Sequence, residues 1–97
     1  MDTQIYKITW QNIEIEIRYK PRDMGSIIAH LEIETINPPR AQLPMTETGY
    51  RSYFHAIGTI EAYGGDVVQY VTDWLNEEAK SKKWLKYIDS MRQGVLF

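Results

Sequence analysis

Residues 13–20 alternate strictly between apolar and charged side chains. A period of two residues is typical of a strand that buries one face. Similar patterns predict strands over 5–10 and 27–36, and Gln11-Asn12 suits the tight turn between the first two, since asparagine tolerates a positive φ. Pro21 has no N–H to donate, so we expect the second strand to end there and a turn to run through Gly25 to Ser26. These segments predict an antiparallel meander.

One face of this meander is polar. Its members are Glu14, Glu16, Arg18, His30, Glu32 and Glu34. Opposite charges that face one another on neighbouring strands stabilise a sheet. We therefore expect charge pairing across the strands on this face, while the apolar face packs against the rest of the chain.

From Val67 onward the apolar positions follow a period of 3.6 residues, which predicts an amphipathic helix with Asp66 near its N-cap. A second apolar stripe begins at Trp84 and is offset by about one residue, so one straight helix would not bury both stripes. We predict a break near Ser81 and a second helix that Gly94 ends. The apolar residues 95–97 are expected to fold back or to meet a partner.

Residues 38–55 lack a clean helix or strand period and are predicted to form a long loop, whereas residues 57–63 are predicted as a fourth strand. Within this stretch, residues 50–56 are ambiguous. The predicted fold class is α+β, with one domain over residues 1–97 in which an antiparallel sheet of three to four strands packs against one or two C-terminal helices. The expected buried residues are Ile8, Trp10, Ile15, Ile17, Leu31, Ile33, Val71, Trp74 and Leu75.

Composition narrows the class of protein. The formal net charge of −2 gives no overall attraction to nucleic acid or to an anionic membrane. The chain has no cysteine, which excludes disulfides and cysteine-based zinc sites and fits the cytoplasm. We find no signal-peptide pattern and no apolar run of membrane-spanning length. Seven Tyr and three Trp in so short a chain favour a protein partner and leave a homodimer open.

The 38–55 loop holds the first candidate site. Its proposed partner-binding residues are Arg40, Glu47, Tyr50, Arg51, Tyr53 and His55. Tyrosine and arginine dominate binding hot spots, and three prolines would lower the entropy cost of ordering the loop on binding. A structural role is the alternative, in which Arg51 holds the loop by pairing with Glu47.

The two histidines are the candidate residues for catalysis or metal binding. His30 and His55, with loop residues Glu47, Tyr50 and Arg51, could serve as general acid and base for phosphodiester cleavage. The same histidines with Glu32 or Glu34 could bind a metal. Neither spacing predicts that these groups converge, so we expect no catalytic residue, no metal and no cofactor. Gly64-Gly65 before a helix is only a weak signal for an anion site.

The second candidate site is the basic segment 80–86. Lys80, Lys82, Lys83 and Lys86 surround Trp84, and such residues can contact phosphates and stack on bases. The alternative is a solvated helix face, in which Glu78 pairs with Lys82 and Trp84 belongs to the core. The acidic net charge favours this alternative.

Two stretches, PPRAQLPMTETGYRSYF and GGDVVQYVTDWLNEEA, resemble a family of small uncharacterised bacterial proteins found on plasmids and in phage-related regions. The resemblance implies a bacterial cytoplasmic protein of mobile-element origin and carries no catalytic residues. Small proteins of that kind often bind host proteins, including defence complexes. The sequence thus favours a non-enzymatic protein-binding module that inhibits or modulates a host complex. The alternative is a nucleic-acid-binding or nucleic-acid-processing protein that uses the 80–86 segment or the 38–55 loop.

Overall fold

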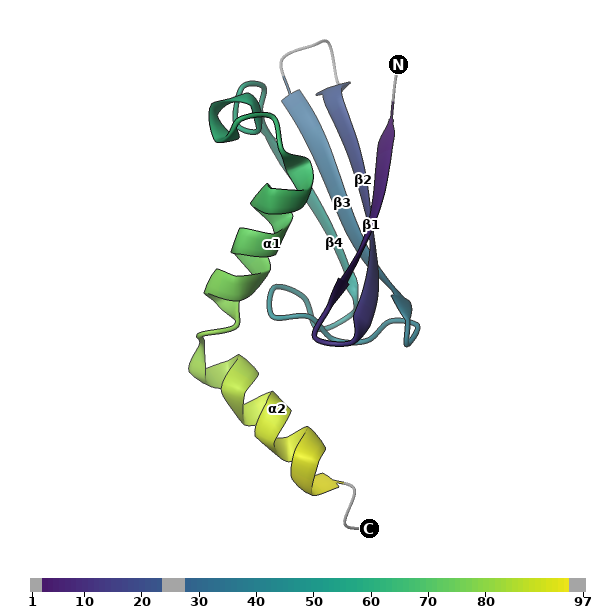
Figure 1. Cartoon of the computed structure of the whole chain (residues 1–97), viewed down its shortest axis with the longest axis vertical. Coiled ribbons are helices and arrows are strands. Elements are labelled where there is room, and N and C mark those ends of the chain that lie inside the picture. Colours follow the sequence, from purple (N-terminus) through teal and green to yellow (C-terminus); the bar gives the residue numbers. More distant parts are fainter. Residues whose placement is uncertain (1–2, 24–27, 95–97) are drawn as a thin grey trace.

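The computed structural model describes residues 3–23 and 28–94, with the side chains of residues 22, 23 and 92–94 left out. Four antiparallel strands form one sheet in the order β1-β2-β3-β4, followed by a short 3-10 helix and two α-helices (Figure 1). The strands are β1 Gln4–Trp10, β2 Ile13–Asp23, β3 Ile28–Asn37 and β4 Tyr50–Ala56. The predicted α+β class is confirmed. The predictions for residues 24–27 and 95–97 fall outside the described residues.

The first hairpin forms as the alternation predicts. Gln11 and Asn12 have φ values of 48° and 66°, and the strands that they join pair from Gln4 with Tyr19 to Trp10 with Ile13. Positive φ at both central residues matches the right-handed twist of the flanking strands.

The prediction that Pro21 ends the second strand is wrong, because β2 continues to Asp23. Lys20 pairs with His30 and Asp23 pairs with Ile28, so β2 has one residue more than β3 between these pairs. A strand tolerates proline at such a bulge, where no ladder hydrogen bond is lost.

The prediction of a fourth strand over 57–63 is also wrong. The fourth strand is β4, over the residues 50–56 that the sequence pattern left ambiguous, and it pairs with β3 from Ile28 with Ala56 to Glu34 with Tyr50. Residues 57–60 form turns, and the 3-10 helix η1 spans Glu61–Tyr63. Gly58 and Gly64 have φ values of 97° and 78°, which lie outside the strand region.

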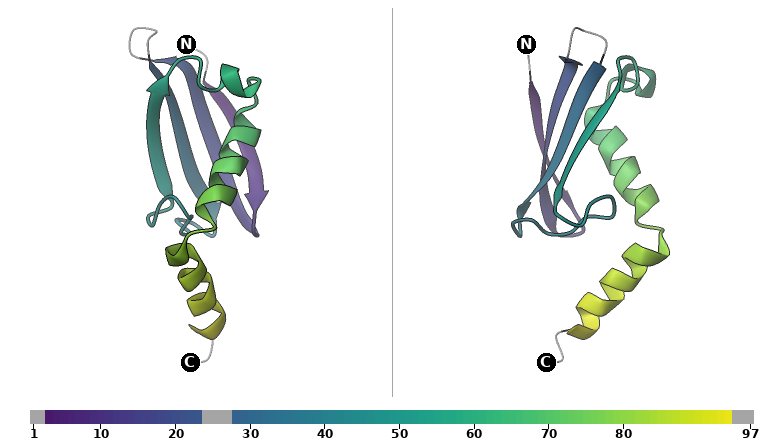
Figure 2. Two further views of the ribbon diagram at one scale, coloured as in Figure 1. Left: turned by 90° about the vertical axis from the view of Figure 1, so that its left-hand side faces the viewer. Right: turned by 180° about the vertical axis from the view of Figure 1, so that it is seen from behind.

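The helix α1, Val67–Glu78, lies across one face of the sheet (Figure 2). Asp66 caps it by accepting a hydrogen bond from the Gln69 amide at 2.9 Å, as predicted. The predicted break is confirmed, since α2 begins after Ser81 and spans Lys82–Gly94. The helix α2 continues beyond the end of the sheet, which gives the molecule extents of 51 × 23 × 19 Å (Figure 1).

The core lies between α1 and the sheet. Seven of the nine residues expected to be buried are buried, whereas Ile8 and Trp74 are only partly buried at its margin. The first turn of α2 joins this core through Trp84, whose ring centroid lies 5.8 Å from that of Trp10. Trp10 also ties β1 to α1, because its Nε1 donates to Asn76 Oδ1 at 2.9 Å. No helix in the described residues is both long and apolar enough to cross a membrane.

Candidate functional site

Since α1 covers one face of the sheet, the side chains of the opposite face lie on a surface that neither helix covers (Figure 2). We call this surface the open face. The open-face residues whose side chains contact one another are Glu16, Arg18, His30, Glu32, Glu34, Tyr50, Ser52 and Phe54. Strand alternation places them there, because their sequence neighbours in β2 and β3 are the buried residues of the core.

Arg18 is the centre of a charge network on the open face. Its guanidinium contacts Glu16 at 2.7 Å, Glu32 at 3.1 Å and Glu34 at 3.0 Å. Partial burial opposes the charge of Arg18, but the hydrogen bonds that it donates to the three carboxylates outweigh this effect and raise its pKa. The expected charge pairing across strands is confirmed, and it fixes side chains of β2 and β3 in one arrangement.

Tyr50 extends this network to β4. Its hydroxyl donates to Glu32 Oε2 at 2.6 Å, while Oε1 of the same carboxylate accepts from Arg18 Nε. The bond from Tyr50 is the main cause that lowers the pKa of Glu32, and the contacts with Arg18 add to it. The same bond raises the pKa of Tyr50. Tyr50 is 39% exposed, so an ordered aromatic ring stands at the surface.

A second pair of β3 and β4 residues lies on the open face beside this network. The imidazole of His30 stacks on the ring of Phe54 with centroids 4.1 Å apart, and His30 Nε2 lies 2.6 Å from Ser52 Oγ. Phe54 is 50% exposed. The open face therefore has a polar centre and exposed aromatic rings along β4.

The loop 38–49 folds against the end of β3 and places Tyr50. Thr35 N–H donates to Gly49 O at 2.8 Å, and the hydroxyl of Thr46 donates to Tyr50 O at 2.8 Å. Gly49 has φ 78° and is packed so closely that a Cβ atom would lie 2.4 Å from Thr35 Oγ1.

A hollow of about 470 Å³ lies where this loop meets the open face. It is lined by Glu34, Arg40, Thr48, Gly49 and Tyr50. Arg40 is exposed and forms no ion pair within the described residues. Two of the predicted partner-binding residues, Arg40 and Tyr50, are thus brought together.

Arg51, Tyr53 and His55 lie on the other face of β4, toward α1. Arg51 is exposed, with Nη1 3.4 Å from Met45 O and its guanidinium 5.6 Å from the centroid of Trp74. The ring of Tyr53 lies 5.2 Å from that of Trp74. His55 is 7% exposed and sits between Tyr19 and Tyr53. These three predicted site residues do not share a surface with Tyr50.

Two ion pairs that the structural alternatives assumed do not form in the described residues. Glu47 pairs with Lys83 of α2 instead of Arg51, and this contact lowers the pKa of Glu47. Glu77 pairs with Lys80 at 3.3 Å, whereas Glu78 and Lys82 form no pair in the described residues. Glu78 and Lys82 lie apart because the turn at 79–81 separates α1 from α2.

The two histidines lie on opposite faces of the sheet, so they do not converge on one catalytic centre. In the described part of the chain, no three His, Asp or Glu side chains are grouped in a way that could hold a metal ion. Of the four lysines in 80–86, Lys80 and Lys83 form ion pairs, and Lys82 and Lys86 are exposed on α2. Trp84 is 3% exposed, as expected for a core residue.

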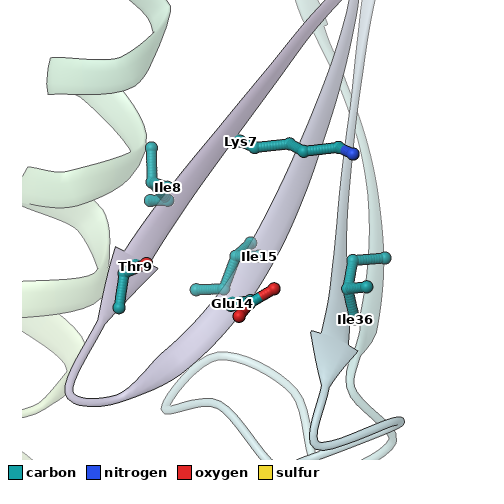
Figure 3. A pocket seen from close by; sticks show the side chains of 6 residues that line it. All are labelled: Lys7, Ile8, Thr9, Glu14, Ile15 and Ile36. Atoms are coloured by element: carbon teal, nitrogen blue, oxygen red, sulfur yellow. The ribbon is translucent and has the colours of Figure 1, made fainter.

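Sequence patterns did not reveal a hollow of about 160 Å³ toward the β1 edge of the sheet, at the same end as the loop 38–49. Lys7, Thr9, Glu14 and Ile36 line it from three neighbouring strands (Figure 3), together with Ile8 and Ile15. Ile36 is 41% exposed, which the strand pattern signals as an apolar residue at a polar position. Alternation alone could not reveal the hollow, because its shape depends on the twist of the sheet.

The chain was compared with known families, curated proteins and solved structures. A family model described as the KlcB third domain matches residues 3–84, which covers all four strands, α1 and the start of α2. No curated protein and no solved structure matches the chain. Because the match spans most of its length, the chain belongs to the KlcB third-domain family.

Proposed function

We propose that this chain is a non-enzymatic protein-binding module whose contact surface is the β4 side of the open face together with the loop 38–49. The observation that carries the proposal is Tyr50, an exposed ring held in one orientation by Glu32. Tyrosine is a preferred hot-spot residue, and a ring that is already ordered loses little entropy on binding.

The surroundings of Tyr50 support the same proposal. Arg40 lines the hollow beside it, and Phe54 exposes half of its ring on the same strand. Glu47 is exposed in the loop, and Arg51, on the other face of the edge strand β4, lies beside Met45 of the loop; in this proposal both extend the contact around that edge. Tyr53 and His55 are less accessible, and in this proposal they hold β4 in place beneath the surface.

The resemblance described above supports a proposal for the origin of the chain and for its target. We propose a bacterial cytoplasmic protein from a mobile element, and a host protein complex, such as a defence complex, as the target that it inhibits or modulates. Association through the open face of two copies is a further arrangement that the same surface allows.

The test is capture of partners from a bacterial lysate with the wild-type chain and with Tyr50→Ala. Tyr63→Ala is the matched control, since Tyr63 is 40% exposed and also donates to a carboxylate, that of Asp73. The proposal predicts that the same partner is recovered repeatedly with wild type and Tyr63→Ala and is lost with Tyr50→Ala. Recovery of no partner, or equal recovery by both variants, contradicts it.

The nucleic-acid alternative is separated by a mobility-shift assay at two salt concentrations. Binding that falls with salt and is lost in Lys82→Glu/Lys83→Glu would favour the alternative, because neutralising phosphates makes affinity depend on salt. The proposal predicts no shift of nucleic acid by the wild-type chain.

A further inference from the structure

We infer that the exposed side of α2 is a second docking surface, separate from Tyr50, and that its occupant is an amphipathic helix of a partner protein bearing acidic residues beside its apolar stripe. This surface consists of Leu85, Ile88 and Met91, bordered by Lys82 and Lys86. It does not rest on the function proposed for the open face.

The first argument is the way α2 is attached to the body. Trp84 is buried against Trp10, and Lys83 pairs with Glu47, so the first turn of α2 is anchored. The helix then continues beyond the sheet (Figure 1). Its later turns have no sheet beneath them.

The second argument is the pattern along these later turns. Leu85 is 56% exposed and Met91 is 57% exposed, and Ile88 lies between them at helical spacing, partly buried against the core. Residues three apart on a helix are neighbours on its surface, so these side chains form one continuous apolar stripe. A helix that leaves such an apolar stripe exposed to water is suited to contact with another helix.

Charge decides what kind of helix fits. Lys82 and Lys86 lie one turn apart and border the stripe on the side of Leu85, where Asp89 sets one negative charge against their two positive charges. Both are exposed, and neither forms an ion pair within the part of the chain that the structure describes. A partner helix with glutamate or aspartate beside its apolar stripe would match these lysines, whereas a lysine-bearing helix would be repelled. A second copy of α2 supplies the same two lysines with only one acid, Asp89, at this border, so it is a poorer electrostatic match.

The probe for the test is a synthetic helical peptide with leucine at the heptad a and d positions and glutamate at the flanking positions. A matched peptide carries lysine in place of glutamate. Titration into the full chain is followed by fluorescence anisotropy of a labelled peptide, at low and at high salt. We expect the glutamate peptide to bind at least about tenfold more tightly than the lysine peptide, and we expect this preference to shrink at high salt.

Three variants of the full chain check the assignment. Leu85→Glu/Met91→Glu and Lys82→Glu/Lys86→Glu should each weaken binding of the glutamate peptide about tenfold or more. Ser90→Glu adds an exposed charge elsewhere on α2 and should leave binding unchanged. Tyr50→Ala should also leave it unchanged, which separates this inference from the function of the open face.

The outcomes that overturn the inference are distinct. Equal affinity for both peptides means that apolar contact alone drives binding, and the acidic occupant is then wrong. No binding of the glutamate peptide, or equal loss with Ser90→Glu, also refutes the site. If sedimentation shows a dimer that Leu85→Glu/Met91→Glu converts to a monomer, the occupant is a second copy of the chain instead.

Discussion

Tyr50 and Glu32 are joined diagonally across β3 and β4. In the strand register Tyr50 faces Glu34, yet its hydroxyl reaches two residues back along β3 to donate to Glu32 Oε2 at 2.6 Å. The other oxygen of Glu32 accepts from Arg18 on β2. One carboxylate therefore links three strands. The hydrogen-bond network holds the exposed ring of Tyr50, at the start of β4, in a fixed position.

Tyr50→Phe keeps the ring but removes the hydroxyl that donates to Glu32. We expect a loss of about 0.5–1.5 kcal/mol in the free energy of unfolding, the usual net value of one hydrogen bond. Urea denaturation followed by circular dichroism measures this loss. Tyr63→Phe is the control for removing an exposed tyrosine hydroxyl bonded to a carboxylate near α1. If Tyr50→Phe lost partner binding with no loss of stability, the hydroxyl would contact the partner directly.

The Glu32 carboxylate predicts a specific pH dependence. The hydrogen bond from Tyr50, helped by Arg18, makes the pKa of Glu32 lower in the folded chain than in the unfolded chain. Such a group stabilises the fold above its unfolded pKa of about 4.3, and this contribution is lost as the pH falls through the lower folded pKa. Glu32→Gln should therefore be less stable than wild type at pH 7, with the difference shrinking below about pH 4.3.

Thermal melts of wild type and Glu32→Gln across this pH range measure the effect. Glu14→Gln is the matched control, since Glu14 is exposed and forms no ion pair in the described residues. Its difference from wild type should stay nearly constant with pH. A Glu32→Gln difference that is just as constant would mean that the carboxylate does not depend on its bonds to Tyr50 and Arg18.

The sequence could predict the elements in which one period dominates. Strict alternation in 13–20 and the two offset helical stripes led directly to β2, α1, α2 and the break near Ser81. The polar members of the open face followed from the same alternation. Arg18 could be expected to pair across strands, because the polar positions 32 and 34 of the next strand are both acidic.

The fourth strand could not be predicted in this way. In β4 aromatic residues occupy both faces, with Tyr53 toward the core and Phe54 toward solvent, so no alternation of polarity is visible. Because β4 was not predicted, its pairing register with β3 could not be predicted either. The bond from Tyr50 to Glu32 and the separation of Tyr50 from Arg51 both depend on that register.

Gly49→Ala should be strongly destabilising. The substitution would place a Cβ atom 2.4 Å from Thr35 Oγ1 and 2.7 Å from the Arg40 backbone, at a φ of 78°. Left-handed strain and overpacking together should cost about 2–5 kcal/mol. Gly64→Ala is a matched control, because Gly64 also has φ 78° but nothing lies within 4 Å of its Cβ position. Chemical denaturation of both variants should give a clearly larger loss for Gly49→Ala, and equal losses would show that the loop can move away.

Arg51→Ala separates recognition from support of the loop. Arg51 is exposed, its hydrogen bond to Met45 O is long at 3.4 Å, and its guanidinium lies over Trp74. We expect a loss of only about 0.5–1 kcal/mol, the size of an exposed cation–π contact. Arg51→Lys keeps the charge but loses the planar group. A much larger fall in melting temperature for Arg51→Ala, with partner binding intact in the folded fraction, would make Arg51 a structural tether.

Trp84→Ala tests how α2 is attached. Trp84 is 3% exposed, and its ring packs between Trp10 and Tyr87 with centroid distances of 5.8 and 5.1 Å. Removing a buried tryptophan should cost about 3–5 kcal/mol. Leu85→Ala, one residue further along the same helix, is the control and should cost well under half as much because Leu85 is 56% exposed. Denaturant titration followed by circular dichroism gives both values. If the two losses were similar, Trp84 would not anchor α2 to the core, and the presentation of Leu85 and Met91 by a fixed helix would lose its physical basis.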